Sequence, residues 1–523
     1  MIFDLQRDTS PTPSEADVCI VGAGAAGIAL AIEFARRGKT VLLIEGGGAT
    51  REESSQALYD SEIAGLPHRG IHTGRIRAKG GTTVRWGGQI LELDAYDFTS
   101  RPGIPSSGWP FPKSELSPYY ERALTLEGLS RVERSDAAVW RNLSLPFTQF
   151  PDLEAYLSRW CPEPNFALMH GETLAAHPSI SLWLHANAVE LLIENGAATC
   201  LRCRTLTGIE HIFRAARFIF CLGGLESSRF FLQPRPGGLP WNRSNLLGRH
   251  FQDHIDCNAA TVEPLDPKTF HDTFDPIFSR GFKYLPKLRL PPSLQAEHNT
   301  LNIGSTMSFE DTGKARYQAK LTVRNLMRAR FGEITRDNLR HTAGHLPMLL
   351  RQIWRYKVQR RAFAPPDVRI FLRVHCEQEP TSRSSITLTG DRDPLGLLRI
   401  RFDWQISGRE LDTIRQYVRI AQRSLAPVAR ILPDEDLMSG SPGSPGSPAF
   451  LSRCDDSNHH MGGMRMSTSD SAGVVDTNLR LYGVANTYIC SSAVFPTSGF
   501  SNPTHTVLAL AVRLCDHLTL GGT

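Results

Sequence analysis

Two short stretches near the C-terminus contain residue types that catalyse proton transfer from an alcohol. His459 and His460 run directly into Gly462-Gly463, and Asn502 stands before Pro503 at the start of a strongly apolar segment. A neutral histidine titrates near neutral pH and serves as a general base, while a second hydrogen-bonding group holds the oxygen that loses its proton. One histidine and Asn502 are therefore predicted to flank the carbon of an alcohol that loses a hydride.

Asn502 also suits a structural role. Pro503 fits the first position of a helix, and Asn is a preferred N-cap residue. The apolar residues that follow recur at the spacing of one helix face, namely Val507, Leu508, Ala511, Leu514 and Cys515. The two histidines could likewise pack in a simple turn. Asn502 is thus predicted either to anchor the substrate oxygen or to cap the helix, and the two roles are compatible.

The N-terminal region has the order of elements that binds a dinucleotide. A buried-strand run, 17–21, ends in a G-x-G-x-x-G turn, a helix follows over 28–37, and a second strand, 40–45, ends in an acid. The glycines let a pyrophosphate lie on the helix N-terminus, and the acid takes the ribose hydroxyls. The predicted contacts are Gly22, Gly24, Ala25, Ala26, Gly27 and Glu45. FAD and NAD share this pattern, so it does not name the cofactor.

A second glycine-rich run, residues 75–88, contains two Gly-Gly pairs separated by hydroxyl residues and a tryptophan. Backbone N–H groups in such a run can approach an anion or a flat ring closely. The cofactor contacts predicted here are Gly81, Thr82, Trp86, Gly87 and Gly88. The alternative is a surface loop that Trp86 stiffens.

Bulk properties exclude several classes of protein. With 523 residues, 41% hydrophobic and 21% charged, the chain suits two domains or one elaborated domain. A net charge of +5 without interleaved basic and aromatic residues argues against nucleic acid as a partner. The C-x-x-C of Cys200 and Cys203 lacks a second pair for zinc, so no metal site is predicted. The scattered cysteines, the polar start and the lack of a long apolar run predict a cytoplasmic protein without a transmembrane segment.

Five stretches together make the chain resemble the glucose-methanol-choline (GMC) oxidoreductases, flavoproteins that include pyranose and cholesterol oxidases, and in particular the bacterial branch. The stretches are Gly22–Glu45, Gly80–Gly88, Cys221–Arg229, Glu377–Arg383 and His459–Leu518. The resemblance implies an α/β fold with a Rossmann-like FAD-binding domain and a discontinuous substrate domain built on an antiparallel sheet. The FAD domain would comprise 1–100, 181–254 and 451–523, and the substrate domain 101–180 and 255–450. Runs 368–375 and 398–404 are expected in the sheet that roofs the flavin.

The resemblance also assigns roles to individual residues. Counted from the glycine pair, His459 rather than His460 matches the family's catalytic base, and Asn502 matches the second catalytic position. Cofactor contacts are implied for Val189, Ser491, Asn502, Pro503 and Thr504, and substrate contacts for Glu377 and His460. Arg85 stands where members with a covalent flavin have histidine, so FAD is predicted to bind noncovalently. The chain departs from the family at Gly463-Met464, Ser491 and His505.

The predicted activity is oxidation of a CH–OH group of a sugar, glycoside or other natural-product alcohol to a carbonyl. Hydride transfer to flavin N5 would accompany removal of the hydroxyl proton by His459, and O₂ or an organic or protein acceptor would reoxidise the flavin. Two alternatives stay open: chemistry of the lyase or decarboxylase type on the same fold, and a noncatalytic flavoprotein that docks through the basic region 324–361. The Ser/Gly/Pro segment 439–448 is expected to be a lid or a tolerated insertion.

Overall fold

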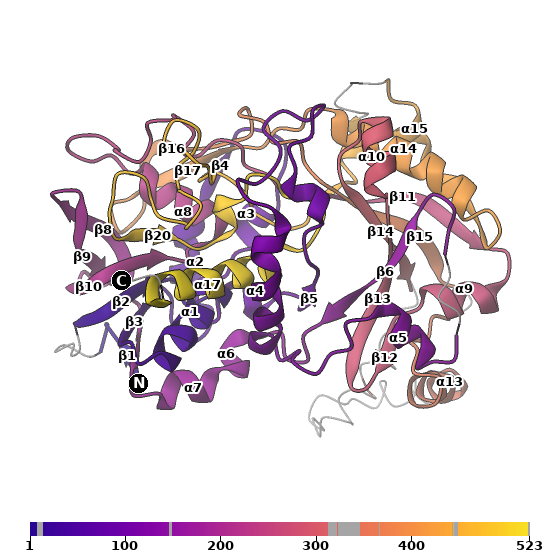
Figure 1. Ribbon diagram of the computed structural model, residues 1–523, viewed down its shortest axis with the longest axis horizontal. Coiled ribbons are helices and arrows are strands. Elements are labelled where there is room, and N and C mark those ends of the chain that lie inside the picture. Colours follow the sequence, from indigo (N-terminus) through magenta and orange to yellow (C-terminus); the bar gives the residue numbers. More distant parts are fainter. Residues whose placement is uncertain are drawn as a thin grey trace.

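The computed structural model describes residues 1–7, 14–145, 149–311, 322, 346–365, 367–441, 443 and 448–520. Two large sheets lie in the two halves of the molecule, with both chain termini in the half that holds the first sheet (Figure 1). The mixed α/β fold predicted from the sequence is confirmed.

The apolar run after residue 16 forms the buried central strand of the first sheet, and this strand is parallel to both of its neighbours. In spatial order the strands are β1 (Ile2–Asp4), β7 (Ile180–Leu184), β3 (Val41–Ile44), β2 (Glu15–Val21), β10 (Glu210–Phe220), β9 (Ala197–Arg204) and β8 (Asn187–Glu194), and β20 (Thr487–Ile489) also pairs with β10. The sheet therefore brings together three segments that are far apart in the chain.

Two long helices direct their N-termini at the carboxyl ends of these strands. Helix α1 (Ala25–Arg36) follows β2, and it packs against α17 (Pro503–Leu520), which in turn packs against α4 (Lys113–Leu126). The predicted apolar stripe of the C-terminal helix is buried. In Figure 1, α17 crosses the first sheet and its N-terminal end points toward the second half of the molecule.

The second sheet is antiparallel and forms the wall opposite the first half. Its strands run in the order β18 (Ala429–Pro433), β11 (Ile255–Pro264), β15 (Arg369–Cys376), β14 (Ile303–Glu310), β13 (Phe282–Arg289), β6 (Glu154–Trp160) and β5 (Gln89–Ile90), with β12 (Ile277–Ser279) on β13 and β19 (Asp455–Asp456) on β11. Helix α14 (Arg409–Ser424) covers one face with a large apolar core between them. The other face carries polar side chains.

A smaller sheet corrects one expectation. Of the two runs expected in the roofing sheet, 368–375 forms β15 as predicted, but 398–404 forms β17 (Leu398–Asp403). This strand pairs with β16 (Ser385–Arg392) and β4 (Ser61–Ile63) instead. Alternation of apolar and polar residues predicts a strand but does not name its partner, which tertiary packing decides. The predicted domain boundaries stay a prediction, and two strands of the second sheet, β5 and β19, lie in ranges predicted for the first domain.

Among the described residues, none of the remaining helices is longer than the 12 residues of α1. The other helices are α2 (Glu53–Gln56), α3 (Gly70–Thr73), α5 (Asp136–Arg141), α6 (Phe166–Met169), α7 (Gly171–Ala176), α8 (Gly223–Leu232), α9 (Pro267–Phe274), α10 (Pro292–His298), α13 (Leu346–Lys357), α15 (Glu435–Met438) and α16 (Pro448–Leu451). Of the basic region 324–361, residues 324–345 lie outside the described residues, as do 442 and 444–447 of the segment 439–448. No helix in the described ranges is both long and apolar enough to cross a membrane.

Candidate active site

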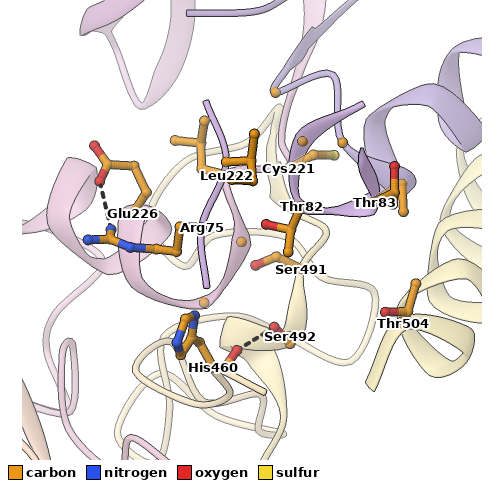
Figure 2. Close-up of a pocket in the computed structure, with 18 of the residues that line it drawn as sticks. Arg75, Thr82, Thr83, Cys221, Leu222, Glu226, His460, Ser491, Ser492 and Thr504 are labelled. Carbon is orange, nitrogen blue, oxygen red and sulfur yellow. Dashed lines mark hydrogen bonds and ion pairs between the residues drawn. The ribbon is translucent and has the colours of Figure 1, made fainter. Parts of the chain in front are cut away.

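A cavity of about 600 Å³ extends from the glycine turn after β2 to the histidines of the C-terminal segment. This volume is typical of a small-molecule or cofactor site. Most residues predicted to contact cofactor or substrate line it: Gly22, Gly24, Ala25, Ala26, Glu45, Gly81, Thr82, Trp86, Gly87, His459, His460, Ser491, Asn502, Pro503 and Thr504. Figure 2 shows Thr82, Ser491, Thr504 and His460 around this space.

Four predicted residues lie outside the cavity lining. Gly27 serves packing, because a Cβ on it would lie 1.9 Å from the carbonyl oxygen of Gly22. Gly88 has a positive φ of 77° in the turn before β5. Val189 lies on β8 beside Ala188, which does line the cavity, so its backbone contact stays a prediction.

Glu377, predicted as a substrate contact, lies away from the cavity in a buried ion pair. Its two carboxylate oxygens accept from the Arg101 guanidinium at 2.8 and 2.6 Å, and one also accepts from the backbone N–H of Asn302 at 2.8 Å. The whole carboxylate is thereby occupied. This geometry assigns Glu377 to the support of the fold.

The adenosine end of the cavity is built around Glu45. Its carboxylate accepts from the backbone N–H groups of Ala23 at 3.0 Å and Gly47 at 2.8 Å, and burial raises its pKa. Gly24 and Gly81 approach each other there, since a Cβ on Gly24 would lie 4.0 Å from the Gly81 Cα. The two glycine-rich runs predicted from the sequence therefore meet at one place.

The residues present fit a bound dinucleotide. The N-termini of α1 and α17 both open onto the cavity, and helix N-termini favour negative charge. Arg75 and Arg77, which sequence reasoning passed over, also line it; Arg75 lies 3.6 Å from Glu226 (Figure 2). A carboxylate at one end, two helix N-termini and two arginines suit the ribose, pyrophosphate and ring system of FAD.

His459 is the hydrogen-bonding centre of the opposite end. Its Nε2 lies 3.2 Å from the Asn502 Nδ2, and its Nδ1 lies 2.9 Å from the His254 Nδ1. An amide nitrogen only donates, so Nε2 accepts and the ring proton resides on Nδ1, which donates to His254. Burial, assisted by nearby charges, lowers the pKa of His459 to about 3, so the ring is neutral. Asn502 thus contacts the predicted base directly, as the anchor interpretation requires.

A buried carboxylate fixes the backbone beside this histidine. Asp253 Oδ1 accepts from the N–H groups of His254 at 2.7 Å, Ser457 at 3.3 Å and His459 at 3.0 Å. Its second oxygen lies 3.1 Å from His68 Nε2. One side chain therefore holds together two segments that are about two hundred residues apart.

His460 points into this network. Its ring lies 5.3 Å from the His68 ring, and its carbonyl accepts from the Ser492 hydroxyl at 2.6 Å (Figure 2). His68, Asp253 and His460 place one ligand-type atom each within 4.8 Å of one another. His68 Nδ1, however, accepts from the Ile71 N–H at 3.1 Å, so Nε2 carries the proton and donates to Asp253. His68 and Asp253 are thus hydrogen-bonded to each other, the His460 ring only packs beside them, and no nitrogen of His68 is left for a metal.

His254 and Asp253 were missed from the sequence because their role depends on tertiary contact. Both stand directly before the alternating strand β11, and nothing in their spacing relates them to residues 457–459. The only local signal was a pair of polar residues at the entrance of an apolar strand, which is also common at ordinary strand ends.

Comparison with known proteins agrees with this geometry. Residues 380–511 match the C-terminal family model of the GMC oxidoreductases, and residues 17–224 match the model of FAD dependent oxidoreductases. A 2-methyl-1,2-propanediol dehydrogenase of Mycolicibacterium austroafricanum is 22% identical over 574 aligned residues, with 97% of this chain and 95% of that protein covered. A 6'''-hydroxyparomomycin C oxidase of Streptomyces lividus is 24% identical, with 95% and 90% covered. The solved structure of pyridoxine 4-oxidase from Mesorbium loti has the same fold, with a TM-score of 0.57 at 17% identity over 96% of this chain and 98% of that chain.

Proposed function

We propose that this chain, which belongs to the GMC oxidoreductase family, oxidises a CH–OH group of a small hydroxylated molecule to a carbonyl with bound FAD. The observation that carries the proposal is the pairing of His459 Nε2 with the Asn502 amide at 3.2 Å on the cavity wall. Two relatives aligned over nearly the whole chain are named as a 2-methyl-1,2-propanediol dehydrogenase and a 6'''-hydroxyparomomycin C oxidase, which supports an alcohol as the substrate.

Several residues would hold the cofactor. Glu45 would take the ribose hydroxyls, the N-terminus of α1 the pyrophosphate, and the N-terminus of α17 the reactive ring. When bound, FAD supplies the acceptor for the hydride that leaves the alcohol carbon. We propose noncovalent binding, because Arg85 lines the cavity and a guanidinium is a donor without a nucleophilic nitrogen at neutral pH.

The histidine and the asparagine divide the work on the hydroxyl group. A substrate oxygen between them would donate its proton to His459 Nε2 and accept a hydrogen bond from the Asn502 amide. The protonated ring would keep a partner, because its Nδ1–H already donates to His254 at 2.9 Å. His254 therefore offsets part of the cost of forming a charged ring in a buried site.

The test is anaerobic reduction of the FAD-loaded enzyme by a panel of sugars, glycosides and diols. At least one alcohol should bleach the flavin, and His459→Ala should keep FAD while losing that reduction. Turnover of a substrate without flavin reduction would favour lyase or decarboxylase chemistry, and full activity of His459→Ala would overturn the assignment of the base. Reoxidation of the reduced enzyme by air or only by an added quinone distinguishes an oxidase from a dehydrogenase.

We also propose a reducing compartment, the cytoplasm, as the location of the protein. All ten cysteines are free, and nine of them are buried. Cysteines left unpaired throughout a chain of this size are typical of proteins that stay in a reducing environment.

A further inference from the structure

Lys287 lies on the face of the second sheet that is turned away from the apolar core. Its neighbour on β13, Leu288, belongs to that core and lies opposite Ser305. The Ser305 hydroxyl forms a hydrogen bond with Tyr417 of α14 at 2.7 Å, so Leu288 and Ser305 face α14. Successive side chains of a strand point to opposite faces. Lys287 therefore points to the face opposite α14, which it shares with its cross-strand neighbour Tyr156.

This face is turned toward the proposed active site. Gly304 lies on it, and a Cβ there would come within 2.6 Å of the ring of Phe500, two residues before Asn502. The Phe500 ring also meets the Tyr156 ring edge-on, at 6.1 Å between centroids. Next along the sheet, His375 Nδ1 lies 3.5 Å from the hydroxyl of Ser457, which lines the cavity. Lys287 is not itself among the residues that line the cavity, but it lies on the sheet face that is turned toward the cavity.

The other charges on this face are already compensated. Both oxygens of Asp256 bond the Arg373 guanidinium, each at 2.7 Å. Glu310 accepts from the Asn258 amide at 2.9 Å and lies at the far end of β14, opposite Arg369. The three nearby histidines, His254, His375 and His459, have pKa values lowered first by burial and are neutral near pH 7.

Among the described residues, Lys287 has no direct partner, and the opposing charge that acts on it is that of Asp256, which Arg373 already binds. It is only 6% exposed, and within the part of the chain that the structure describes its ammonium makes no hydrogen bond or ion pair. Burial lowers its pKa to about 8 against the opposing effect of Asp256, so it is still mostly charged at neutral pH. Its charge contributes to the lowered pKa of each of the three histidines, which places it within electrostatic reach of His459. A buried cation without a partner is costly unless a ligand supplies one.

We propose that Lys287 binds a carboxylate of the substrate, so that the alcohol oxidised belongs to a hydroxy acid or a sugar acid. The inference rests on the proposed alcohol oxidation and names its substrate class. One ammonium matches one negative charge, whereas a phosphate would bring nearly two charges close to Asp256. Phosphate recognition also favours several donors, and the cation beside Lys287, Arg373, is already committed to Asp256.

The experiment compares matched pairs of ligands that differ only in the carboxylate. Binding to oxidised, FAD-loaded enzyme is measured from the perturbation of the flavin spectrum, with lactate against 1,2-propanediol and D-gluconate against D-glucitol. Wild type should bind the acid at least tenfold more tightly in one or both pairs. Lys287→Gln should reduce that preference to within about twofold, and Lys287→Arg should keep most of it.

A matched control lies four residues earlier on the same strand. The Lys283 ammonium already has a partner, since it lies 3.6 Å from the centre of the Trp160 ring, so Lys283→Gln should retain the preference for acids. Thermal unfolding with and without each acid provides a second measure: acids should stabilise the wild type and not Lys287→Gln.

Equal affinity for both members of each pair, or a preference that survives Lys287→Gln, would overturn the inference. Failure of the proposed function looks different. In that case no alcohol, acidic or neutral, reduces the flavin, while the dependence of acid binding on Lys287 is still measurable on the oxidised enzyme.

Discussion

Removal of His254 tests whether the second histidine supports the proposed base. In the structure His254 Nδ1 lies 2.9 Å from His459 Nδ1, and it is the acceptor that the protonated His459 ring would keep during the reaction. His254→Ala removes this acceptor and leaves the charged ring without a partner on that side. A hydrogen bond to a charged group contributes about 1.5–3 kcal/mol, which corresponds to roughly a 10- to 150-fold slower reduction of the flavin.

The assay is single-turnover, anaerobic mixing of the FAD-loaded variant with a substrate of the wild type, followed by flavin absorbance. His254→Asn offers a side-chain carbonyl as an alternative acceptor and should recover part of the rate, which a merely space-filling role would not predict. FAD content and melting temperature measured on the same samples separate loss of catalysis from loss of fold. A His254→Ala enzyme that is well folded, holds FAD and reduces it at the wild-type rate would refute the reasoning.

Three further predictions use other contacts. Asn502→Ala should slow flavin reduction more than tenfold with FAD retained; a drop in melting temperature at normal turnover would instead assign the residue to capping α17. Glu377→Gln breaks the buried pair with Arg101 and should destabilise the fold by roughly 3–5 kcal/mol in urea unfolding, leaving the KM of surviving enzyme unchanged. The pKa of His459 lies near 3 when folded and near 6.5 when unfolded, so only the unfolded chain gains this proton between those values. Other buried groups titrate in the same range, among them Asp97 with a pKa raised to about 7, so wild type is compared with His459→Asn. The urea midpoint of the wild type should fall more steeply from pH 6.5 toward 4 than that of the variant, and equal slopes contradict the buried neutral ring.

The parts of the site that depend on local sequence were predictable. The glycine turn after β2 and Glu45 at the end of β3 lie within one βαβ unit, where spacing along the chain dictates spacing in space. The identification of His459 and Asn502 needed one further assumption, that two segments 43 residues apart meet, and the structure brings their side chains to 3.2 Å.

The parts that depend on distant contacts were not predictable. His254 reaches His459 across 205 residues, and Arg101 reaches Glu377 across 276. From the sequence, a glutamate in a stretch expected at the active-site roof is interpreted as a substrate ligand. The sequence does not show whether its carboxylate is free to bind a substrate or is already bound to an arginine. Only the position of the arginine decides between them.

For the same reason, the role of Lys287 could not be predicted from the residues around it in the sequence. The sequence of strand β13 contains no functional motif, and a lysine on an antiparallel strand is normally expected to face water. The fold instead buries Lys287 on the sheet face turned toward the cavity, near neutral histidines and a carboxylate that Arg373 already binds. Burial that keeps the base neutral also makes a cation without a direct partner costly. The cost falls if the substrate itself carries the compensating negative charge. Burial keeps His459 neutral, and Lys287 stays mostly charged in spite of burial; together the two residues favour an alcohol that carries its own anion.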